Sequence, residues 1–297
     1  MNKYLKLEYL HLSTDYRSNK ALMSKLLNDD YKEYGSDGSF FDKESILSRI
    51  PLKTSQRYHI DNYEYQVSEN ELNANYILKA FDDYELSYKL RCKSHWVKGE
   101  MWQLKLFEYE IIEVRKTRAL FIDLQGTLGG YGLGDISEFE FFDKALDALK
   151  KAVKSDYKVF ITTNQSAIEK GIITQQQYNE HEQRLLSEMK IEDIVLDGFY
   201  CCPHKYTKCT CKKPLAGLVE LASNDHDLLI EESYVIGDMG ASDMMLAKNI
   251  GSKSILVQTG VGKGSLNEFR DTWEGEPTFV ATDINDAINY VLGEYND

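Results

Sequence analysis

The sequence predicts two domains of different classes, an α+β domain followed by an α/β domain with a doubly wound parallel sheet. The chain has 297 residues, which is enough for two cores at about 100–200 residues each. After residue 117, short apolar runs alternate with helical patterns, whereas before it helical patterns come first and long alternating strands follow. The change falls in "EVRKTR" at 113–118, so we predict domains 1–115 and 116–297.

The first domain is predicted to begin with helices and to continue as an antiparallel meander. Helical patterns cover 4–27 and 41–50. Apolar and polar residues then alternate, as is typical of strands with one buried face, over 57–68, 71–83, 85–99 and 100–112.

The second domain shows the β-α alternation of a parallel sheet with helices on both faces. Apolar, β-branched runs predict strands at 119–123, 158–163, 194–202, 233–238 and 254–260. Helical patterns separate them at 141–155, 174–190, 214–225 and 241–251. Ligands of such sheets bind beyond the carboxyl ends of the strands, so functional residues are expected there.

Composition excludes several classes of function. The formal net charge of −13 disfavours nucleic-acid binding, which depends on clustered Lys and Arg. The first twenty residues are charged and amphipathic and lack the apolar run of a signal peptide or a membrane span. We therefore expect a cytoplasmic protein with no membrane and no nucleic-acid partner.

The first two predicted strands end in groups suited to phosphate. Asp123 in "FIDLQGT" is followed by Gly126 and Thr127, which allow a tight turn whose amides can face a phosphate. Thr163 and Asn164 end the next strand with a hydroxyl and an amide. Taken singly, each group also fits a turn or a helix cap.

Later strand ends add cations and further carboxylates. Lys212 and Lys213 stand before Pro214, where a held lysine can neutralise a phosphoryl group, although surface lysines are more often solvated. Asp238 and Asp243 follow a buried strand and offer the hard oxygen ligands that Mg²⁺ prefers, although an Asp there also suits a helix N-cap.

Four of the five cysteines cluster between 201 and 211. In a reducing compartment this favours metal ligation over disulfides. With either Cys201 or Cys202, the segment "CCPHKYTKCTC" supplies four soft or borderline donors, because His204, Cys209 and Cys211 complete the set. That donor set predicts a closed tetrahedral zinc site.

The ordered motifs "DLQGT", "TTNQ", "KP" and "GDMGASD" resemble those of the haloacid dehalogenase superfamily over 117–293. The resemblance implies that Asp123 is a nucleophile that forms an aspartyl-phosphate. It implies that Mg²⁺ is held by Asp123, the main-chain carbonyl of Gln125 and Asp238, with Asp243 in support. It also implies that phosphoryl oxygens are held by Thr163 and Lys213, with further phosphate or substrate contacts from Thr127, Asn164 and Lys212.

The zinc motif narrows the resemblance to one branch. The C-P-H and C-x-C-x-K-P patterns are similar to those of heptose bisphosphate and histidinol phosphate phosphatases. This selects Cys202, rather than Cys201, as the ligand that joins His204, Cys209 and Cys211. It implies a structural zinc that shapes a short loop in place of a large cap, and a small phosphorylated metabolite as substrate. Lys212 stands where this branch usually has Arg.

The first domain resembles the nuclear transport factor 2-like cone fold over most of 1–113, through its order of elements. That family includes enzymes, ligand binders and dimerisation modules, so the fold assigns no activity. A homodimer through this domain is one expectation.

Gln125 stands where phosphatases of the superfamily usually have an Asp that works as a general acid and base. A glutamine amide has no proton to exchange at neutral pH, and such catalysis is worth roughly 10²–10⁴ in rate. The main hypothesis is thus a Mg²⁺-dependent phosphohydrolase that Gln125 attenuates or alters. The alternatives are a catalytically impaired phosphate-binding, regulatory or dimerisation protein, and a phosphotransferase.

Loops around the expected pocket are predicted to set selectivity, at 129–138, 165–174 and 203–212. The segment "TGVGKGS" at 259–265 fails the nucleotide-binding rule and is predicted to be the loop after the fifth strand, at the pocket rim.

Overall fold

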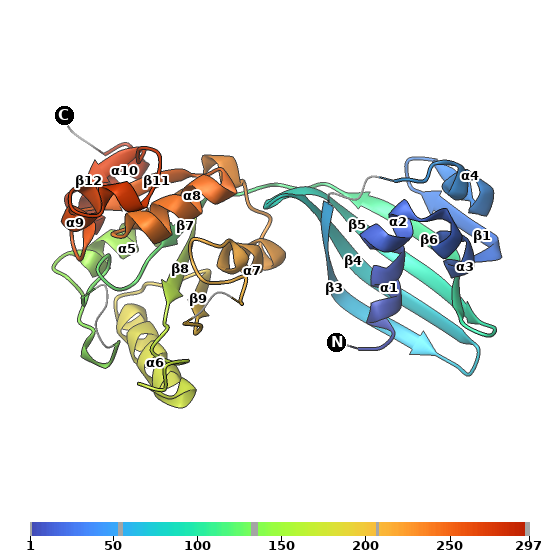
Figure 1. Cartoon of the computed structure of the whole chain (residues 1–297), viewed down its shortest axis with the longest axis horizontal. Helices are drawn as coiled ribbons and strands as arrows, with labels where there is room; N and C mark the ends of the chain where they lie inside the picture. Colours follow the sequence, from blue (N-terminus) through green and yellow to red (C-terminus); the bar gives the residue numbers. More distant parts are fainter. Residues whose placement is uncertain (1, 53–55, 132–135, 206–207, 295–297) are drawn as a thin grey trace. The chain divides into compact units, whose positions relative to one another are not determined.

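The computed structural model describes residues 2–52, 56–131, 136–205 and 208–294. The chain divides into two compact units, Met1–Arg115 and Lys116–Asp297 (Figure 1). Within the described ranges, no helix combines the length and the apolar composition needed to cross a membrane.

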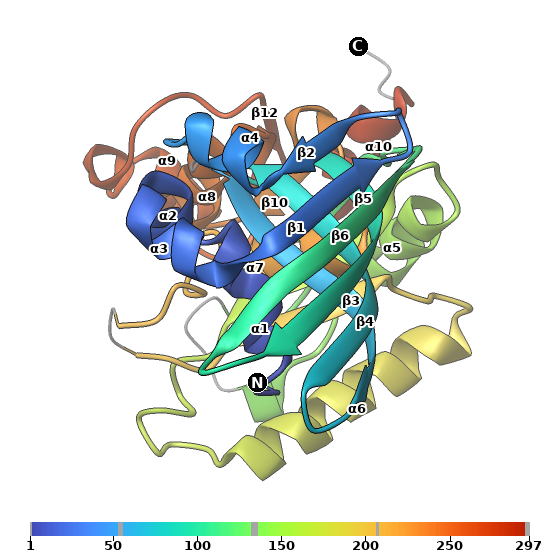
Figure 2. The same ribbon diagram turned by 90° about the vertical axis from the view of Figure 1, so that its right-hand side faces the viewer.

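The N-terminal unit packs short helices against one face of a curved six-stranded sheet (Figures 1 and 2). Its helices are α1 (Leu5–Leu12), α2 (Thr14–Ser18), α3 (Lys20–Leu26) and α4 (Lys43–Ser48). Its strands are β1 (Leu27–Gly35), β2 (Phe40–Asp42), β3 (Gln56–Val67), β4 (Glu71–Asp82), β5 (Glu85–Lys98) and β6 (Trp102–Ile112). Helix residues such as Met23 and Leu26 meet the strand residues Trp96 and Leu104 in one core.

This architecture confirms the predicted α+β class, with two strands added. β3 to β6 form the expected antiparallel meander, in the sheet order β2-β1-β6-β5-β4-β3. β1 and β2 were not predicted, and β1 pairs with β6 in parallel. The reason is that in the polar sequence "LNDDYKEYG" only Leu27 and Tyr31 are buried, and a register shift separates Leu27 from Lys32. Apolar and polar residues do not alternate regularly along such a strand, so the sequence pattern does not indicate it.

The C-terminal unit is built on a six-stranded sheet whose strand pairs are all parallel. Its strands are β7 (Ala119–Ile122), β8 (Lys158–Asn164), β9 (Gly198–Cys202), β10 (Tyr234–Gly237), β11 (Lys253–Val257) and β12 (Phe279–Ala281). Its α-helices are α5 (Ala145–Val153), α6 (Gln175–Ile191), α7 (Gly217–Asp225), α8 (Met245–Ile250), α9 (Gly262–Leu266) and α10 (Ile284–Leu292). Short 3₁₀ turns cover Ile136–Glu138, Ile230–Glu232 and Arg270–Thr272, and a π-helical turn, Gly240–Met244, precedes α8.

The strand order β12-β11-β10-β7-β8-β9 confirms the doubly wound class and decides where a site can form. From β7 the chain builds outward through β8 and β9, then returns to β10 on the other side of β7 and builds outward again. The loops after β7 and β10 therefore diverge and leave a crevice at the carboxyl ends of these strands. The five predicted strands are present, whereas β12, α9 and α10 were not predicted.

Candidate active site

Three carboxylates gather at the crevice between β7 and β10. Asp123 directly follows β7, Asp238 follows β10, and Asp243 lies in the π-helical turn after it. All three are buried, and one carboxylate oxygen of each lies within 4.8 Å of the others. Gly126 makes room for this packing: its φ is +86°, and a Cβ there would lie 2.1 Å from Asp238 Oδ2. A side chain at this turn would thus displace a carboxylate.

Lys213 joins two of these carboxylates. Its Nζ donates to Asp123 Oδ1 and to Asp243 Oδ1, each at 2.6 Å, and the residue is 3% exposed. The side chain of Asn164, at the end of β8, accepts from the Lys213 N–H at 3.0 Å and donates to the Lys213 carbonyl at 3.1 Å. Asn164 therefore fixes the backbone that carries the lysine.

The electrostatics of the cluster favour a cation. Burial raises the pKa of Asp123 to about 6, with the Lys213 charge opposing the shift and Asp243 adding to it. Burial, then the charges of Asp123 and Asp243, raise the pKa of Asp238 to about 8. Burial disfavours the charged Lys213, but the two adjacent carboxylates outweigh it and raise its pKa above the usual range. Three buried carboxylates facing one lysine form a hard-oxygen set that fits Mg²⁺.

The loop after β11 holds Asp238 in place. The Val261 N–H donates to Asp238 Oδ2 at 2.8 Å, and the Ser265 hydroxyl donates to the Asp238 main-chain carbonyl at 2.9 Å. The Thr259 hydroxyl donates to the Gly126 carbonyl at 2.7 Å. The segment 259–265 does follow the fifth strand as predicted, and sequence reasoning missed that it supports a carboxylate.

Gln165 ends the motif "TTNQ", but no role was predicted for its side chain. It is 3% exposed, and its Nε2 donates to Gln125 Oε1 at 2.8 Å and to Thr163 Oγ1 at 2.9 Å. The oxygen of the Gln125 amide is thus engaged, while its Nε2 donates to the Tyr131 carbonyl at 3.5 Å. Its place in that motif, just after the polar strand end at Thr163 and Asn164, is the signal that could have indicated a role.

These groups surround a cavity of about 200 Å³. The predicted residues that line it are Asp123, Gln125, Thr163, Asn164, Lys212, Lys213, Asp238 and Asp243. Ser166, which belongs to the predicted pocket loop 165–174, lines it as well, and so do Met239 and Ser242, which were not named as site residues.

Two predicted phosphate contacts have other partners in this structure. Thr127 does not line the cavity; it is fully buried, and its hydroxyl donates to Asp123 Oδ2 at 3.4 Å. Lys212 lines the cavity, and its Nζ donates to the Lys205 carbonyl at 2.8 Å. Within the loops predicted to set selectivity, 132–135 and 206–207 lie outside the described residues.

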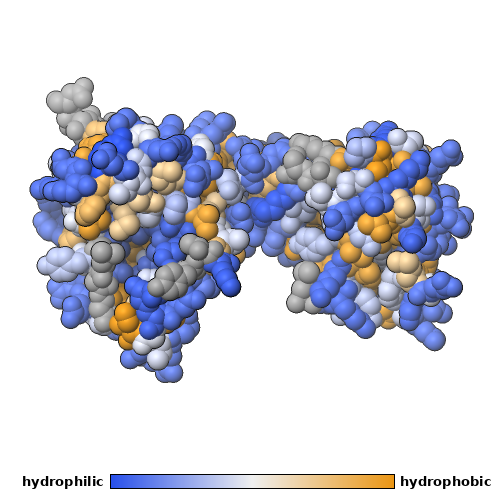
Figure 3. Space-filling model, in the orientation of Figure 1, coloured by the Kyte–Doolittle hydropathy of each residue, from blue (hydrophilic) through white to orange (hydrophobic). Residues whose placement is uncertain are grey.

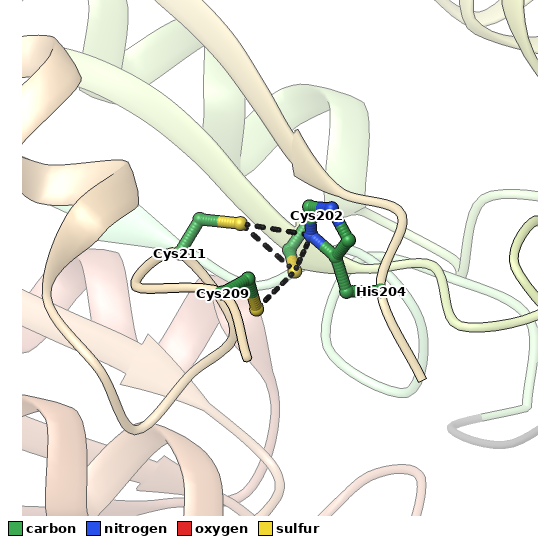
Figure 4. A group of neighbouring side chains, drawn as sticks. All are labelled: Cys202, His204, Cys209 and Cys211. Atoms are coloured by element: carbon green, nitrogen blue, oxygen red, sulfur yellow. Dashed lines mark hydrogen bonds between the residues drawn. The ribbon is translucent and has the colours of Figure 1, made fainter. Parts of the chain in front are cut away.

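A second cluster lies at the carboxyl end of β9 and in the loop after it, where four side chains converge on a common point (Figure 4). Their ligand atoms lie within 4.8 Å of one another, and the residues are Cys202, His204, Cys209 and Cys211. Cys202 Sγ is 3.8 Å from Cys209 Sγ, and His204 Nδ1 is 3.3 Å from Cys211 Sγ. Bonds of about 2.3 Å from zinc place tetrahedral sulfur ligands roughly 3.8 Å apart, which matches the Cys202–Cys209 pair, whereas the Cys202 and Cys211 Sγ atoms lie closer, at 3.1 Å. The donor set, three thiols and one imidazole, fits a structural zinc site.

Cys201 does not belong to this cluster. Successive residues of a strand point to opposite faces, so Cys201 and Cys202 cannot both face the same point. The cluster also ends two residues before Lys213, so a metal there would order the loop that delivers the lysine.

Known proteins resemble the C-terminal unit. A family model described as HAD-hydrolase-like matches residues 210–287. The D-glycero-beta-D-manno-heptose-1,7-bisphosphate 7-phosphatase of Yersinia pestis is 34% identical over 168 residues, which cover 52% of this chain and 88% of that protein. The crystal structure of a D,D-heptose 1,7-bisphosphate phosphatase from B. bronchiseptica, complexed with magnesium and phosphate, has a TM-score of 0.54 and 25% identity over 60% of this chain and 99% of that chain.

For the N-terminal unit, a nuclear transport factor 2-like protein from Cytophaga hutchinsonii aligns over 38% of this chain and 100% of that chain. The identity is 16% and the TM-score 0.32, which is too low for a functional argument. The unit itself has the order on which the predicted resemblance depends, helices followed by a curved sheet. The matches to the C-terminal unit confirm the predicted family resemblance there and the prediction of a phosphatase.

Proposed function

The chain belongs to the haloacid dehalogenase superfamily of phosphatases, and from this premise we propose that it is a Mg²⁺-dependent phosphohydrolase of a small sugar bisphosphate. The observation that carries the proposal is the bridge of Lys213 between Asp123 and Asp243 at a cavity that Asp238 also lines. The names of the relatives favour a heptose 1,7-bisphosphate as substrate. The loop with Cys202, His204, Cys209 and Cys211 supports the same substrate. Its C-P-H and C-x-C-x-K-P patterns are similar to those of the heptose bisphosphate phosphatases.

Asp123 is the proposed nucleophile. With a pKa of about 6 it is mainly ionised at neutral pH. One carboxylate oxygen bonds to phosphorus while the bond from phosphorus to the ester oxygen breaks, and the sugar alkoxide takes a proton from solvent. Water then attacks the aspartyl-phosphate, the phosphorus–Asp123 bond breaks, and inorganic phosphate leaves with the carboxylate restored. Lys213 holds Asp123 in position and offers positive charge to the phosphoryl group.

Mg²⁺ would be held by Asp123, Asp238 and the main-chain carbonyl of Gln125, with Asp243 in support. Bound there, it supplies charge neutralisation for the phosphoryl oxygens. Thr163 lines the cavity and is the proposed hydroxyl contact to those oxygens.

Gln125 is proposed to limit the rate of phosphate hydrolysis. Gln165 donates to the Gln125 amide oxygen, and the Gln125 Nε2 donates to the Tyr131 carbonyl, so the amide is held at both ends by neutral groups and has no proton to exchange. It can stabilise a leaving oxygen but cannot activate water. We therefore expect slow turnover on alkyl phosphates, faster turnover on anomeric or acyl phosphates, and a long-lived phosphoenzyme.

The test is phosphate release by the full chain from heptose 1,7-bisphosphate, fructose 1,6-bisphosphate and histidinol phosphate, with and without Mg²⁺. We expect Mg²⁺-dependent release that Asp123→Asn abolishes. No release from any substrate, with Asp123→Asn identical to the parent, would refute hydrolysis and favour a phosphate-binding protein. Product that forms only with an added acceptor alcohol would identify a phosphotransferase instead.

Gln125→Asp tests the role of the amide separately. If the native site is attenuated, this variant should gain about 10²-fold or more on alkyl phosphates. Lower activity on all substrates would instead assign Gln125 to an altered mechanism.

A further inference from the structure

The N-terminal unit contains a cavity that the proposed phosphatase chemistry does not use. Its volume is about 170 Å³, and it lies between the helices and the strand β1. One part of the lining is apolar, formed by Met23, Leu27, Phe41, Ile46 and Leu52. The other part is polar, formed by His11, Arg17, Tyr31, Glu33 and Arg49. The lining therefore suits a ligand with one apolar side and one polar side.

His11 is the unusual residue of this lining. It is 9% exposed, and within the described ranges neither ring nitrogen has a hydrogen-bond partner. Its ring packs against Trp96 and Phe107, with centroids at 6.4 and 5.1 Å. Burial, with the charge of Arg17, lowers its pKa to about 3, despite the opposing effect of the Glu8 carbonyl, so the imidazole is neutral. A neutral imidazole offers one donor and one acceptor, and burying both without partners is costly.

The charges of the lining favour an anion. Two arginines and one glutamate leave a net charge of +1 with His11 neutral, in a chain whose net charge is −13. The guanidinium of Arg49 lies 4.1 Å over the Phe41 ring, which orients its planar donors. The Tyr31 hydroxyl donates to Glu33 Oε2 at 2.6 Å. Burial raises the pKa of Glu33, against the Tyr31 hydrogen bond and the two arginines. Because its carboxyl group shares the lining with the arginines, a monoanion fits better than a phosphate dianion.

We propose that this cavity binds a small organic monocarboxylate with an apolar body and a hydroxyl group. The carboxylate meets Arg17 and Arg49, the apolar body lies against Phe41 and its apolar neighbours, and the hydroxyl pairs with His11. The volume equals that of about six liquid water molecules at about 30 Å³ each, which limits the ligand to roughly one ring with its substituents.

Calorimetric titration of the full chain with 4-hydroxybenzoate tests the proposal, with 4-hydroxybenzamide as the neutral control. Saturable binding of the acid and at least about tenfold weaker binding of the amide are expected, because the amide lacks the charge-assisted hydrogen bonds. Arg49→Met should weaken binding of the acid about tenfold or more. Arg91→Met, in an exposed ion pair with Glu110 on β5 and β6, is the matched control and should leave the affinity unchanged.

His11→Leu separates binding from structure. It should weaken binding of 4-hydroxybenzoate about tenfold and yet raise the melting temperature of the free protein, because it removes buried unpaired nitrogens. A lower melting temperature with unchanged affinity would overturn the role given to His11. The proposal fails if neither the acid nor the amide binds saturably. It also fails if Lys213→Met abolishes binding of the acid, since the carboxylate would then occupy the C-terminal cavity.

Discussion

The two units bury carboxylates in opposite ways. In the C-terminal unit, Asp123 is paired with a buried cation, Lys213, at 2.6 Å. In the N-terminal unit, Glu8 is fully buried and accepts hydrogen bonds from Ser94 at 2.6 Å, Trp96 at 2.9 Å and Tyr76 at 3.0 Å, all neutral donors.

This difference separates a reactive site from a structural one. Neutral donors satisfy the Glu8 carboxylate within the folded unit and tie α1 to the sheet. The C-terminal carboxylates outnumber their lysine, so charge is left over for a cation. A buried acid therefore indicates chemistry only when its partners leave charge uncompensated in a cavity.

The largest expected effect concerns the zinc cluster, which has no counterpart in the described part of the N-terminal unit. Cys202→Ser should reduce bound zinc from one equivalent to none, because structural zinc sites contribute about 10 kcal/mol or more of binding free energy. Cys201→Ser, one residue away on the other face of β9, is the matched control and should retain zinc. Elemental analysis of both purified variants is the measurement. Loss of zinc from Cys201→Ser alone would reverse the ligand assignment.

The next effect tests the ionic character of the C-terminal cluster. Lys213→Met should lower the free energy of unfolding in the absence of Mg²⁺ by about 3–5 kcal/mol, because it leaves buried carboxylates without a cation. Urea unfolding in buffer without added Mg²⁺, followed through the fluorescence of Trp273 in this unit, measures it. Lys212→Met is the neighbouring control, since the Lys212 Nζ donates to the main-chain carbonyl of Lys205. Equal midpoints for the two variants would show that the bridge is not a stabilising ion pair.

In the N-terminal unit, the buried Glu8 should make the free energy of unfolding depend on pH. Burial raises its pKa from 4.5 to about 7, against the opposing hydrogen bonds from Ser94, Tyr76 and Trp96. Below pH 4.5 the Glu8 carboxyl is protonated in both the folded and the unfolded chain. Between pH 4.5 and 7 it ionises in the unfolded chain but stays protonated in the folded one, so the free energy of unfolding falls as the pH rises. The loss is about 3 kcal/mol in total and is constant above pH 7.

Glu8→Gln removes this titration. Relative to the parent, the variant should gain about 3 kcal/mol of unfolding free energy between pH 4.5 and 8. Unfolding followed through Trp96 at several pH values measures the difference, with the surface change Glu44→Gln as control. A difference between variant and parent that does not vary with pH would show that Glu8 titrates normally.

The smallest effect concerns Gln165. Gln165→Leu should lower kcat about tenfold while KM changes little, because Gln125 and Thr163 lose the donor that orients them. Gln183→Leu, on the exposed surface of α6, is the control. Steady-state phosphate release measures both variants. A rise in KM with unchanged kcat would place Gln165 in substrate binding instead.

The sequence predicted most strands of the parallel sheet but missed others. The strands β7, β8, β10 and β11 are short apolar runs buried on both faces, and such runs are visible in a sequence. β1 and β12 were missed because one carries few buried residues and the other has only three residues.

The sequence by itself determined that Asp123, Thr163 and Asp238 meet, because parallel strands bring their carboxyl ends to one edge. It also indicated the Cys and His donors of the second cluster, which lie within ten residues, although the choice of Cys202 over Cys201 came from the family resemblance. Only the tertiary structure decided which side chains touch: Lys213 bridges Asp123 and Asp243, and Gln165 engages Gln125. It alone left His11 without a partner beside a cavity. The physical reason is that hydrogen bonds and burial depend on distances between segments far apart in the chain, which local patterns do not encode.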